Sequence, residues 1–246
     1  MPTIQGSKDR KVATSFTPGG AVRFSNTFGL RSGSEFSCRS ATEACTDCYA
    51  FSLERAYTNV RNVMDTNFHV MSSLSYDGMI DALGDILDEF EAKSRKWDAE
   101  LLYRIHWDGD LFSETYARAW VEQVSRRPAV KFWIYTRDAD CWRILIDANL
   151  SNLSVFHSVD ETDQVLTGVN QLTVAEKLRD EYGDAYRPAV LAKTRERSQQ
   201  IGKDLIGKPI AVCPELTGQI PLNGACARCR LCIDRKVNGI AFFTDH

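Results

Sequence analysis

The sequence predicts an α/β protein folded as an incomplete or irregular (β/α) barrel, TIM-barrel-like in outline, with a cysteine-rich C-terminal extension. Short apolar strands alternate with helical segments along most of the 246 residues, a pattern typical of βαβ units in a parallel sheet. Six or seven strands at this spacing fit an open barrel better than a doubly wound nucleotide-binding sheet, because the chain contains neither a G-x-G-x-x-G motif nor a P-loop.

The chain is expected to form one domain, because no internal repeat and no low-complexity linker divides it. Residues 1–20 are expected to be an irregular arm that ends in a Pro18-Gly19-Gly20 turn. Residues 21–212 then form the barrel-like domain, and residues 213–246 form the cysteine-rich extension, packed on the same domain.

The strands are indicated by short apolar runs between turn residues. The first run alternates imperfectly, and the sixth leads straight into Cys213. The expected strands are residues 21–30, 101–107, 130–136, 153–159, 189–193, 209–212 and 240–243.

The helices are indicated by apolar residues that recur at i, i+3, i+4 and i+7. Ser113 is expected to cap a helix that Pro128 ends. Cys141 lies on a short helix and is expected to be a buried small hydrophobe. The expected helices are residues 49–72, 77–96, 113–127, 140–148, 173–182 and 195–201.

The composition favours a cytoplasmic protein that holds a metal. A net charge of −3 gives no global attraction to nucleic acid or to an anionic membrane. No apolar run approaches the roughly 18 residues of a membrane span, and residues 1–15 lack the apolar core of a signal peptide. The chain has eight cysteines, and in a reducing compartment cysteines in clusters indicate metal binding rather than disulfides.

The C-terminal cysteines form the first candidate metal site. Cys226, Cys229 and Cys232 follow C-x2-C-x2-C spacing, and Cys213 lies thirteen residues upstream, next to Pro214. Three closely spaced thiolates completed by a remote one are typical of iron–sulfur proteins. A structural zinc ion more often takes its ligands as separated pairs. We therefore expect a [4Fe-4S] cluster, with zinc as the alternative metal.

The second candidate site is a three-cysteine loop after the first strand, formed by Cys38, Cys45 and Cys48. Three ligands leave one iron of a cubane without a protein ligand, and an open iron can bind a substrate or cofactor, as an open zinc site does. Alternatively, two cysteines of each set share one cluster or zinc ion and the others stay free. The sequence leaves open whether there are one or two clusters.

Other candidate residues lie where the strands end, which is where α/β barrels place their sites. Each also has a structural interpretation: a histidine on a strand often belongs to the core, an Asp-Gly pair shapes a turn, and a cation at a strand end forms a salt bridge. The candidate catalytic residues are His106, Asp108, Asp110 and Arg137, and the candidate cofactor-binding residues are Tyr49, Asp108 and Lys193.

Basic residues surround the C-terminal cysteines. They either offset the negative charge of a thiolate-bound cluster or form a nucleic-acid patch. These residues are Arg228, Arg230, Arg235 and Lys236.

The three-cysteine loop resembles that of the radical S-adenosylmethionine enzymes, in which an aromatic residue often stands beside the last cysteine, as Tyr49 does here. The spacing departs from that superfamily, with x6 then x2 in place of x3 then x2, and its glycine-rich motif after the second strand is replaced by Asp108-Gly109-Asp110. The resemblance implies a radical-SAM-like barrel in which an open-iron [4Fe-4S] cluster binds S-adenosylmethionine.

A closer resemblance is to the phage family known as gene product 88 and spans roughly residues 20–246. It implies a phage protein with a radical-SAM-like barrel and defines no reaction. For a phage protein, the cytoplasmic location expected from the composition is the host cell cytoplasm. The motifs that carry it are Cys38 through the CTDCYA run at 45–50, WDGDLF at 107–112, FWIYTR at 132–137, and the block from Cys213 to Cys232.

Three functions follow from these patterns. The first is a radical enzyme that binds S-adenosylmethionine. The second is a non-enzymatic iron–sulfur protein for redox sensing, electron transfer or binding of a host protein. The third is a zinc module that interacts with nucleic acid.

Overall fold

The computed structural model of the protein describes residues 3–161 and 170–244. Residues 1–2 of the expected arm and 245–246 of the expected extension lie outside the described residues. Over the described part, seven strands form one sheet in the order β1-β2-β3-β4-β5-β7-β6, and neighbouring strands run parallel. The strands are β1 Thr27–Gly29, β2 Leu102–Asp108, β3 Lys131–Thr136, β4 Leu153–Asp160, β5 Pro188–Ala192, β6 Ala211–Val212 and β7 Ile240–Phe243.

The parallel α/β sheet is confirmed, and each expected strand has a counterpart, but the described strands do not close into a barrel. The sheet ends at β1 on one side and at β6 on the other. These edge strands are only three and two residues long, too short for the staggered ladder that closure of a barrel requires.

The first strand is shorter than expected because the residues before it bind the N-terminal arm. Val22 forms an isolated antiparallel bridge with Phe16. The amide side chain of Asn26 accepts a hydrogen bond from the Asp9 N–H at 2.7 Å and donates one to the Asp9 carbonyl at 2.9 Å. Pairing with β2 therefore begins only at Thr27.

The expected helix over 49–72 is divided in two, because Tyr57 adopts an extended conformation with φ −126° and ψ 101°. The Ser113 cap is confirmed, since its side chain accepts from the Tyr116 N–H. No helix in the described ranges is long and apolar enough to cross a membrane. The helices are α1 Tyr49–Ala56, α2 Thr58–Ser73, α3 Tyr76–Lys96, α4 Glu114–Ser125, α5 Ala139–Asp147, α6 Gln171–Tyr182, α7 Arg195–Ile206 and α8 Ala225–Cys229, with 3-10 turns at Glu43–Asp47 and Gly183–Ala185.

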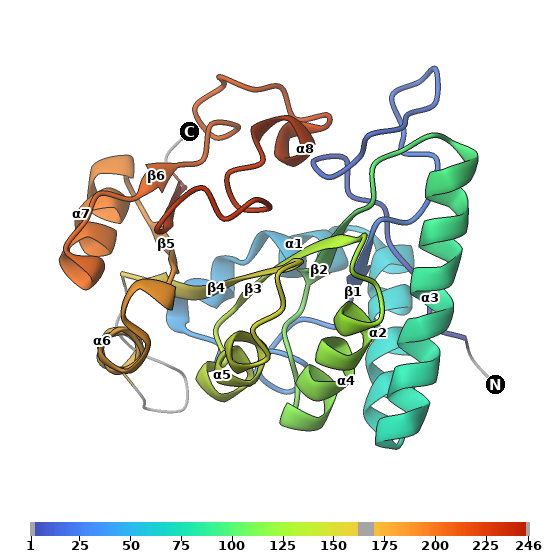
Figure 1. The fold of residues 1–246 in the computed structure, drawn as a ribbon, viewed down its shortest axis with the longest axis horizontal. Helices are drawn as coiled ribbons and strands as arrows, with labels where there is room; N and C mark the ends of the chain where they lie inside the picture. The colour runs from blue at the N-terminus through green and yellow to red at the C-terminus, as the bar shows by residue number, and fades with distance from the viewer. Residues whose placement is uncertain (1–2, 162–169, 245–246) are drawn as a thin grey trace.

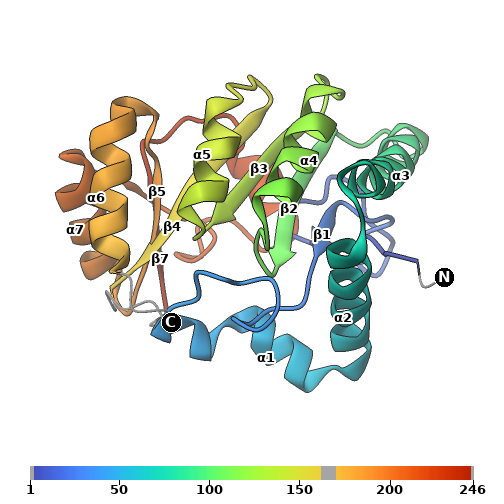
Figure 2. The ribbon, with the colours of Figure 1, turned by 90° about the horizontal axis from the view of Figure 1, so that it is seen from below.

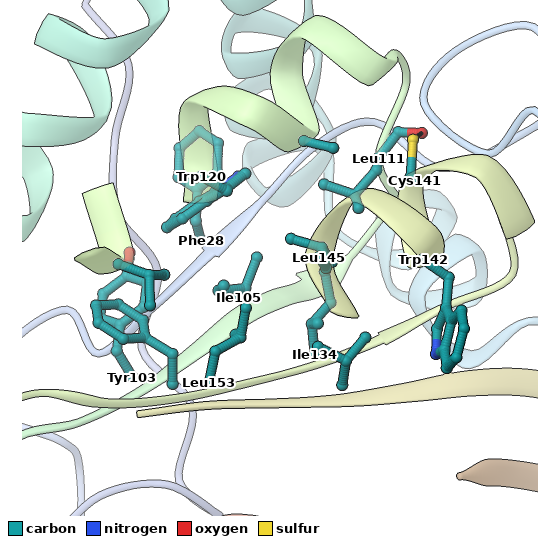
Figure 3. Packing of buried hydrophobic residues seen from close by; sticks show 14 of the residues in the cluster. Phe28, Tyr103, Ile105, Leu111, Trp120, Ile134, Cys141, Trp142, Leu145 and Leu153 are labelled. Atoms are coloured by element: carbon teal, nitrogen blue, oxygen red, sulfur yellow. Dashed lines mark hydrogen bonds between the residues drawn. The ribbon is translucent and has the colours of Figure 1, made fainter. Parts of the chain in front are cut away.

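Different segments of the chain pack on the two faces of the sheet (Figure 1). Helices α3 to α7 pack on one face and bury the main core there. Figure 3 shows part of that core, in which Tyr103, Ile105 and Ile134 of the sheet meet Trp120 of α4 and Leu145 of α5. In each strand, the residues between these core residues point their side chains to the other face of the sheet, which we call the open face. It is covered by the N-terminal arm and by the segment that carries α8.

Two further residues of the helix-covered face are fully buried. Cys141 is fully buried in this core, as expected. His157 of β4 is also fully buried, with its Nδ1 3.0 Å from the hydroxyl of Tyr186. Burial lowers the pKa of His157 to about 3 and therefore keeps the ring neutral.

We expect His157 to make the fold sensitive to acid. Because its pKa is about 3 in the folded protein and about 6.5 when unfolded, the unfolded chain binds more protons between these values, and stability falls as the pH drops from 6.5 towards 3. The free energy of unfolding should lose about 2 kcal/mol through this residue between pH 7 and pH 5. Urea titrations of His157→Gln should show a correspondingly smaller loss.

The matched control is His69→Gln, because His69 is exposed on α2. Its unfolding free energy should keep the pH dependence of the wild type. Equal pH dependence in wild type and His157→Gln would contradict the assignment of a neutral buried imidazole.

Two candidate cysteine centres

The N-terminal cysteine loop, residues 30–48, runs along the edge of the sheet where the parallel strands end, with α1 directly after it (Figure 2). Its three cysteines, Cys38, Cys45 and Cys48, are free thiols of intermediate burial in the described structure. This is the carboxyl end of the strands, as the sequence predicted, and it is the edge where α/β proteins build their sites.

Asp110 fixes the loop to the ends of β2 and β3. Its backbone N–H donates to the Ser37 hydroxyl at 3.1 Å. Its carboxylate accepts from the backbone N–H of Leu111 at 2.7 Å and from that of Arg137 at 2.9 Å. Burial raises the pKa of Asp110 to about 6. Both carboxylate oxygens therefore accept backbone hydrogen bonds that hold the loop in place. This fits a structural role of Asp110 in the turn better than a catalytic role.

Arg137 and Asp160 connect the same loop to β3 and β4. The Arg137 guanidinium lies 2.5 Å from the Asp160 carboxylate, and the Thr42 hydroxyl donates to the same carboxylate oxygen. Thr42 also directs its backbone N–H at the sulfur of Cys45, at 3.4 Å. The candidate Arg137 thus holds a cysteine-bearing turn in place through a buried ion pair.

A bulge in β2 contains the candidate residue His106 and sets the direction of its side chain. Thr27 pairs with Arg104 and Gly29 with Asp108, so four residues of β2 span two of β1. His106 lies in this bulge with φ +56°, a conformation that side chains rarely adopt. Its ring is buried on the helix-covered face, with Nε2 3.2 Å from the Tyr116 hydroxyl, and burial lowers its pKa to about 3. The structure makes His106 a core residue.

Asp108 differs from Asp110, because its buried carboxyl group lies beside the carboxyl group of Glu54 and makes no hydrogen bond of regular geometry. The residue is 2% exposed, and neither carboxylate oxygen has a hydrogen-bond partner among the described residues. Burial, and next the neighbouring carboxyl group of Glu54, raise its pKa to about 8. Its charge also contributes to the raised pKa of Cys48, of which burial is the main cause. Asp108 therefore lies beside the cysteine loop with hydrogen-bonding capacity to spare.

Glu54 was missed by the sequence analysis. It lies on α1, 1% exposed, and pairs with Arg31 at 2.5 Å while accepting from the N–H and hydroxyl of Ser32 at 2.9 and 3.0 Å. These contacts anchor the start of the cysteine loop to the helix that follows it. No periodicity marks a buried glutamate on a short helix, so only the fold reveals it.

Tyr49 and Lys193, the remaining cofactor-binding candidates, have different surroundings. Tyr49 is 56% exposed, yet its hydroxyl donates to the Trp107 carbonyl at 2.5 Å and accepts from Arg104 at 3.3 Å. It thereby joins the start of α1 to the end of β2. Lys193 is exposed just after β5, and its backbone N–H donates to Glu161 at 2.6 Å.

The C-terminal cysteines lie on the open face. Cys226 and Cys232 pack with Trp133 and Tyr135 of β3, and Cys213 packs with Phe156 of β4. The N-terminal arm holds this segment, because its Lys11 and Arg10 carbonyls accept from the N–H groups of Cys226 and Gly224 at 2.8 and 2.7 Å. Two remote parts of the chain therefore meet over the middle of the sheet.

Electrostatic effects among the thiols separate them into two groups. Burial is the main cause that raises the pKa of Cys226, of Cys229 and of Cys232, the last to about 12, and Cys213 adds to all three. Burial also raises the pKa of Cys38 and of Cys48, and Cys45 adds to both. In each case the cysteine neighbours named belong to the same group. The thiols of each group therefore lie near one another.

The described residues 3–161 and 170–244 contain no three His, Cys, Asp or Glu side chains arranged to hold a single metal ion. A zinc site would require four ligands within ~2.3 Å of one point. An iron–sulfur cluster carries its own iron and sulfide between the thiolates, so it suits thiols that are grouped without converging. A buried donor supports this fit, because Arg104 Nε lacks a hydrogen-bond partner in the described structure, and the guanidinium charge lowers the pKa of Cys226 against the larger effect of burial.

Comparison with known proteins places this arrangement in a family. The family described as "Gene product 88" matches residues 3–235. The chain belongs to the gene product 88 family. It is 34% identical to the Gene 88 protein of Mycobacterium phage L5 over 249 residues, which covers 97% of each chain, and 34% identical to that of Mycobacterium phage D29 over 248 residues, 96% of each. No solved structure matches.

The basic residues near the C-terminal cysteines of this gene product 88 protein are largely engaged within the fold. Arg230 pairs with Glu100 and, at 3.0 Å, with Asp234, and Asp234 also lies 3.4 Å from Lys236. Arg235 donates to the Leu150 and Leu153 carbonyls, and Arg228 to the Asn223 carbonyl at 2.8 Å. These contacts give little support to a nucleic-acid patch.

We expect Arg137→Met to destabilise the protein by about 3–5 kcal/mol, because it removes the guanidinium that pairs with the Asp160 carboxylate, which is 1% exposed. The control is Arg143→Met, whose ion pairs with Asp140 and Glu181 are largely exposed and should be worth ~1 kcal/mol or less. Urea unfolding of the two variants measures the difference. Equal stability would show that Arg137 does not hold the cysteine loop.

Proposed function

We propose that this protein is an iron–sulfur protein with two cysteine-ligated [4Fe-4S] clusters on a radical-SAM-like scaffold. The observation that carries the proposal is the separation of the clustered cysteines into a group of four on the open face and a group of three at the carboxyl edge. Four thiols can complete a cubane, and three leave one iron open.

Cys213, Cys226, Cys229 and Cys232 would hold the C-terminal cluster. Their setting supports this role, because the thiols are grouped, partly buried and backed by the aromatic side chains of β3 and β4. A low-dielectric setting with few water contacts is what sets the reduction potential of such clusters. We assign this centre to electron storage or transfer.

Cys38, Cys45 and Cys48 would hold the N-terminal cluster, and its open iron would bind S-adenosylmethionine. The cluster, once reduced by an external one-electron reductant, would supply the electron that cleaves the cofactor. Two residues support a cofactor site beside these cysteines. The Asp108 carboxyl group, neutral near pH 7 because its pKa is raised to about 8, would ionise beside an ammonium group and pair with it, and the exposed ring of Tyr49 can stack on a base. The surrounding ion pairs of Arg137 and Arg31 keep the loop rigid.

A second function is favoured by the same Asp108 carboxylate. If it binds the fourth iron instead of a cofactor, both clusters are fully ligated by the protein. The chain would then be a non-enzymatic iron–sulfur protein that senses redox state, transfers electrons or binds a host protein. The position of Asp108 beside Cys48 and its lack of another partner support either role.

Iron and sulfide counts test the number of clusters. Protein purified and reconstituted without oxygen should contain about eight irons and eight sulfides per chain, as two cubanes require. Cys229→Ser and Cys45→Ser should each lower the iron content to about four, because each removes a ligand of a different group. Cys141→Ser is the control and should keep about eight, since Cys141 lies in the core.

Iron that disappears entirely in either single variant would indicate one shared site. Colourless protein that contains zinc would support the alternative metal and contradict both iron–sulfur functions.

Asp108→Ala distinguishes the two functions, measured by equilibrium binding of S-adenosylmethionine and by iron content. With an open iron, the wild type binds the cofactor and Asp108→Ala weakens binding about tenfold or more, because it removes a charge-assisted contact. With Asp108 as a ligand, the wild type does not bind, and the variant loses iron from the N-terminal cluster or gains binding.

A further inference from the structure

Arg104 of β2 occupies the space between the two cysteine groups. It pairs with Trp133 in the β2–β3 register, so its side chain projects to the open face, where Trp133 packs with Cys226 and Cys232. Its guanidinium carbon lies 5.6 Å from the centre of the Tyr135 ring, and Tyr135 packs against the same cysteines. The side chain is only 18% exposed.

Two of the three guanidinium nitrogens of Arg104 have partners, and the third has none among the described residues. Nη1 lies 3.1 Å from the Asp9 carboxylate of the N-terminal arm, and Nη2 donates to the Tyr49 hydroxyl at 3.3 Å. The buried Nε has no hydrogen-bond partner among the described residues. A buried N–H without an acceptor is costly, and a cation on an aromatic ring cannot satisfy it.

A sulfur acceptor would remove this cost. The C-terminal thiols are the neighbours that can provide one, since the guanidinium lies over the ring of Tyr135, which belongs to the same packed cluster as Cys226 and Cys232. The guanidinium remains charged, because arginine is always protonated in proteins, and it pairs with the Asp9 carboxylate. A fixed positive charge at this position favours any state in which the sulfur-bound centre carries more negative charge.

We propose that Arg104 is a positioning and tuning residue of the C-terminal cluster, donating Nε–H to a cluster-bound sulfur and raising its reduction potential. This inference rests on the proposed function. Asp9 has the opposite effect, because it brings a negative charge to the same site while it orients the guanidinium. The pair sets the potential at which the centre accepts one electron from an external reductant.

The test is a redox titration with dithionite, followed by electron paramagnetic resonance. It is done in a Cys45→Ser background, so that only the C-terminal cluster gives a signal. Arg104→Gln should shift the one-electron reduction equilibrium at least tenfold towards the oxidised form, a potential lower by about 59 mV. Asp9→Asn should shift it towards the reduced form.

The matched control is Arg127→Gln. Arg127 is a comparably buried arginine that forms ion pairs with Asp88 and Glu91. It follows α4 and contacts α3, away from the open face. Its substitution should leave the potential unchanged. Arg104→Lys keeps the charge without Nε–H and should shift the equilibrium less than Arg104→Gln.

The outcomes separate this inference from the proposed function. If neither the wild type nor any variant binds iron, the proposed function fails. If the clusters are present and Arg104→Gln titrates like Arg127→Gln, the tuning role is wrong and the proposed function stands. If Arg104→Gln does not fold, Arg104→Lys and Asp9→Asn decide: opposite shifts support the proposal, and unchanged potentials overturn it.

Discussion

The order of the strands constrains where every other part of this molecule can go. From β1 to β5 the strands follow in sequence, and right-handed crossovers in one direction place their helices on one face of the sheet. From β6 the chain turns back to β7, which lies between β5 and β6. A right-handed crossover in the reverse direction must pass over the opposite face. The cysteine-rich segment is this reverse crossover, which explains why α8 lies on the open face (Figure 1).

This constraint also separates the two cysteine groups. The N-terminal loop leaves β1 at the carboxyl edge, where it contacts the ends of β2, β3 and β4 through Asp110, Arg137 and Asp160. The C-terminal cysteines instead cover the middle of the sheet beside Tyr135. The residue between them is Arg104, a single buried cation that touches the arm, α1 and β3. The arrangement allows two centres to be near one another without sharing ligands.

The sequence predicted the elements better than their arrangement. Hydrophobic periodicity located each described strand and most helices, because burial on one face or stripe determines that pattern. It could not locate the break at Tyr57, which depends on one extended residue, nor the reversal at β7, which leaves no periodic signal. An open or incomplete barrel was expected from the number and spacing of the strands and from the missing nucleotide-binding motifs, whereas the described strands form one open sheet that ends at the two-residue β6.

For the candidate site, too, the sequence predicted which residues take part better than how they are arranged. Cysteine spacing identified the thiols, since ligand spacing is local in sequence. It could not tell that Asp110 is saturated by backbone N–H groups while Asp108, two residues away, is not, because the contact of Asp110 with Arg137 forms only when the ends of β2 and β3 come together in the fold. Glu54 and Arg104 were missed for a related reason, since their partners lie 22 or more residues away in the chain.

The burial of the thiols has a consequence for how the fold and a metal centre depend on each other. Without metal, burial favours the neutral thiol at Cys38, Cys226 and Cys232, whose pKa values are raised. Metal binding requires thiolates, so protons must leave as the centre forms, and affinity increases with pH. The positive charge of Arg104 opposes this cost at the C-terminal group. Because that group is held between the arm and the sheet, a cluster assembled there would fasten the N-terminal arm and the cysteine-rich segment to the open face, and its free energy of binding would add to the stability of the domain.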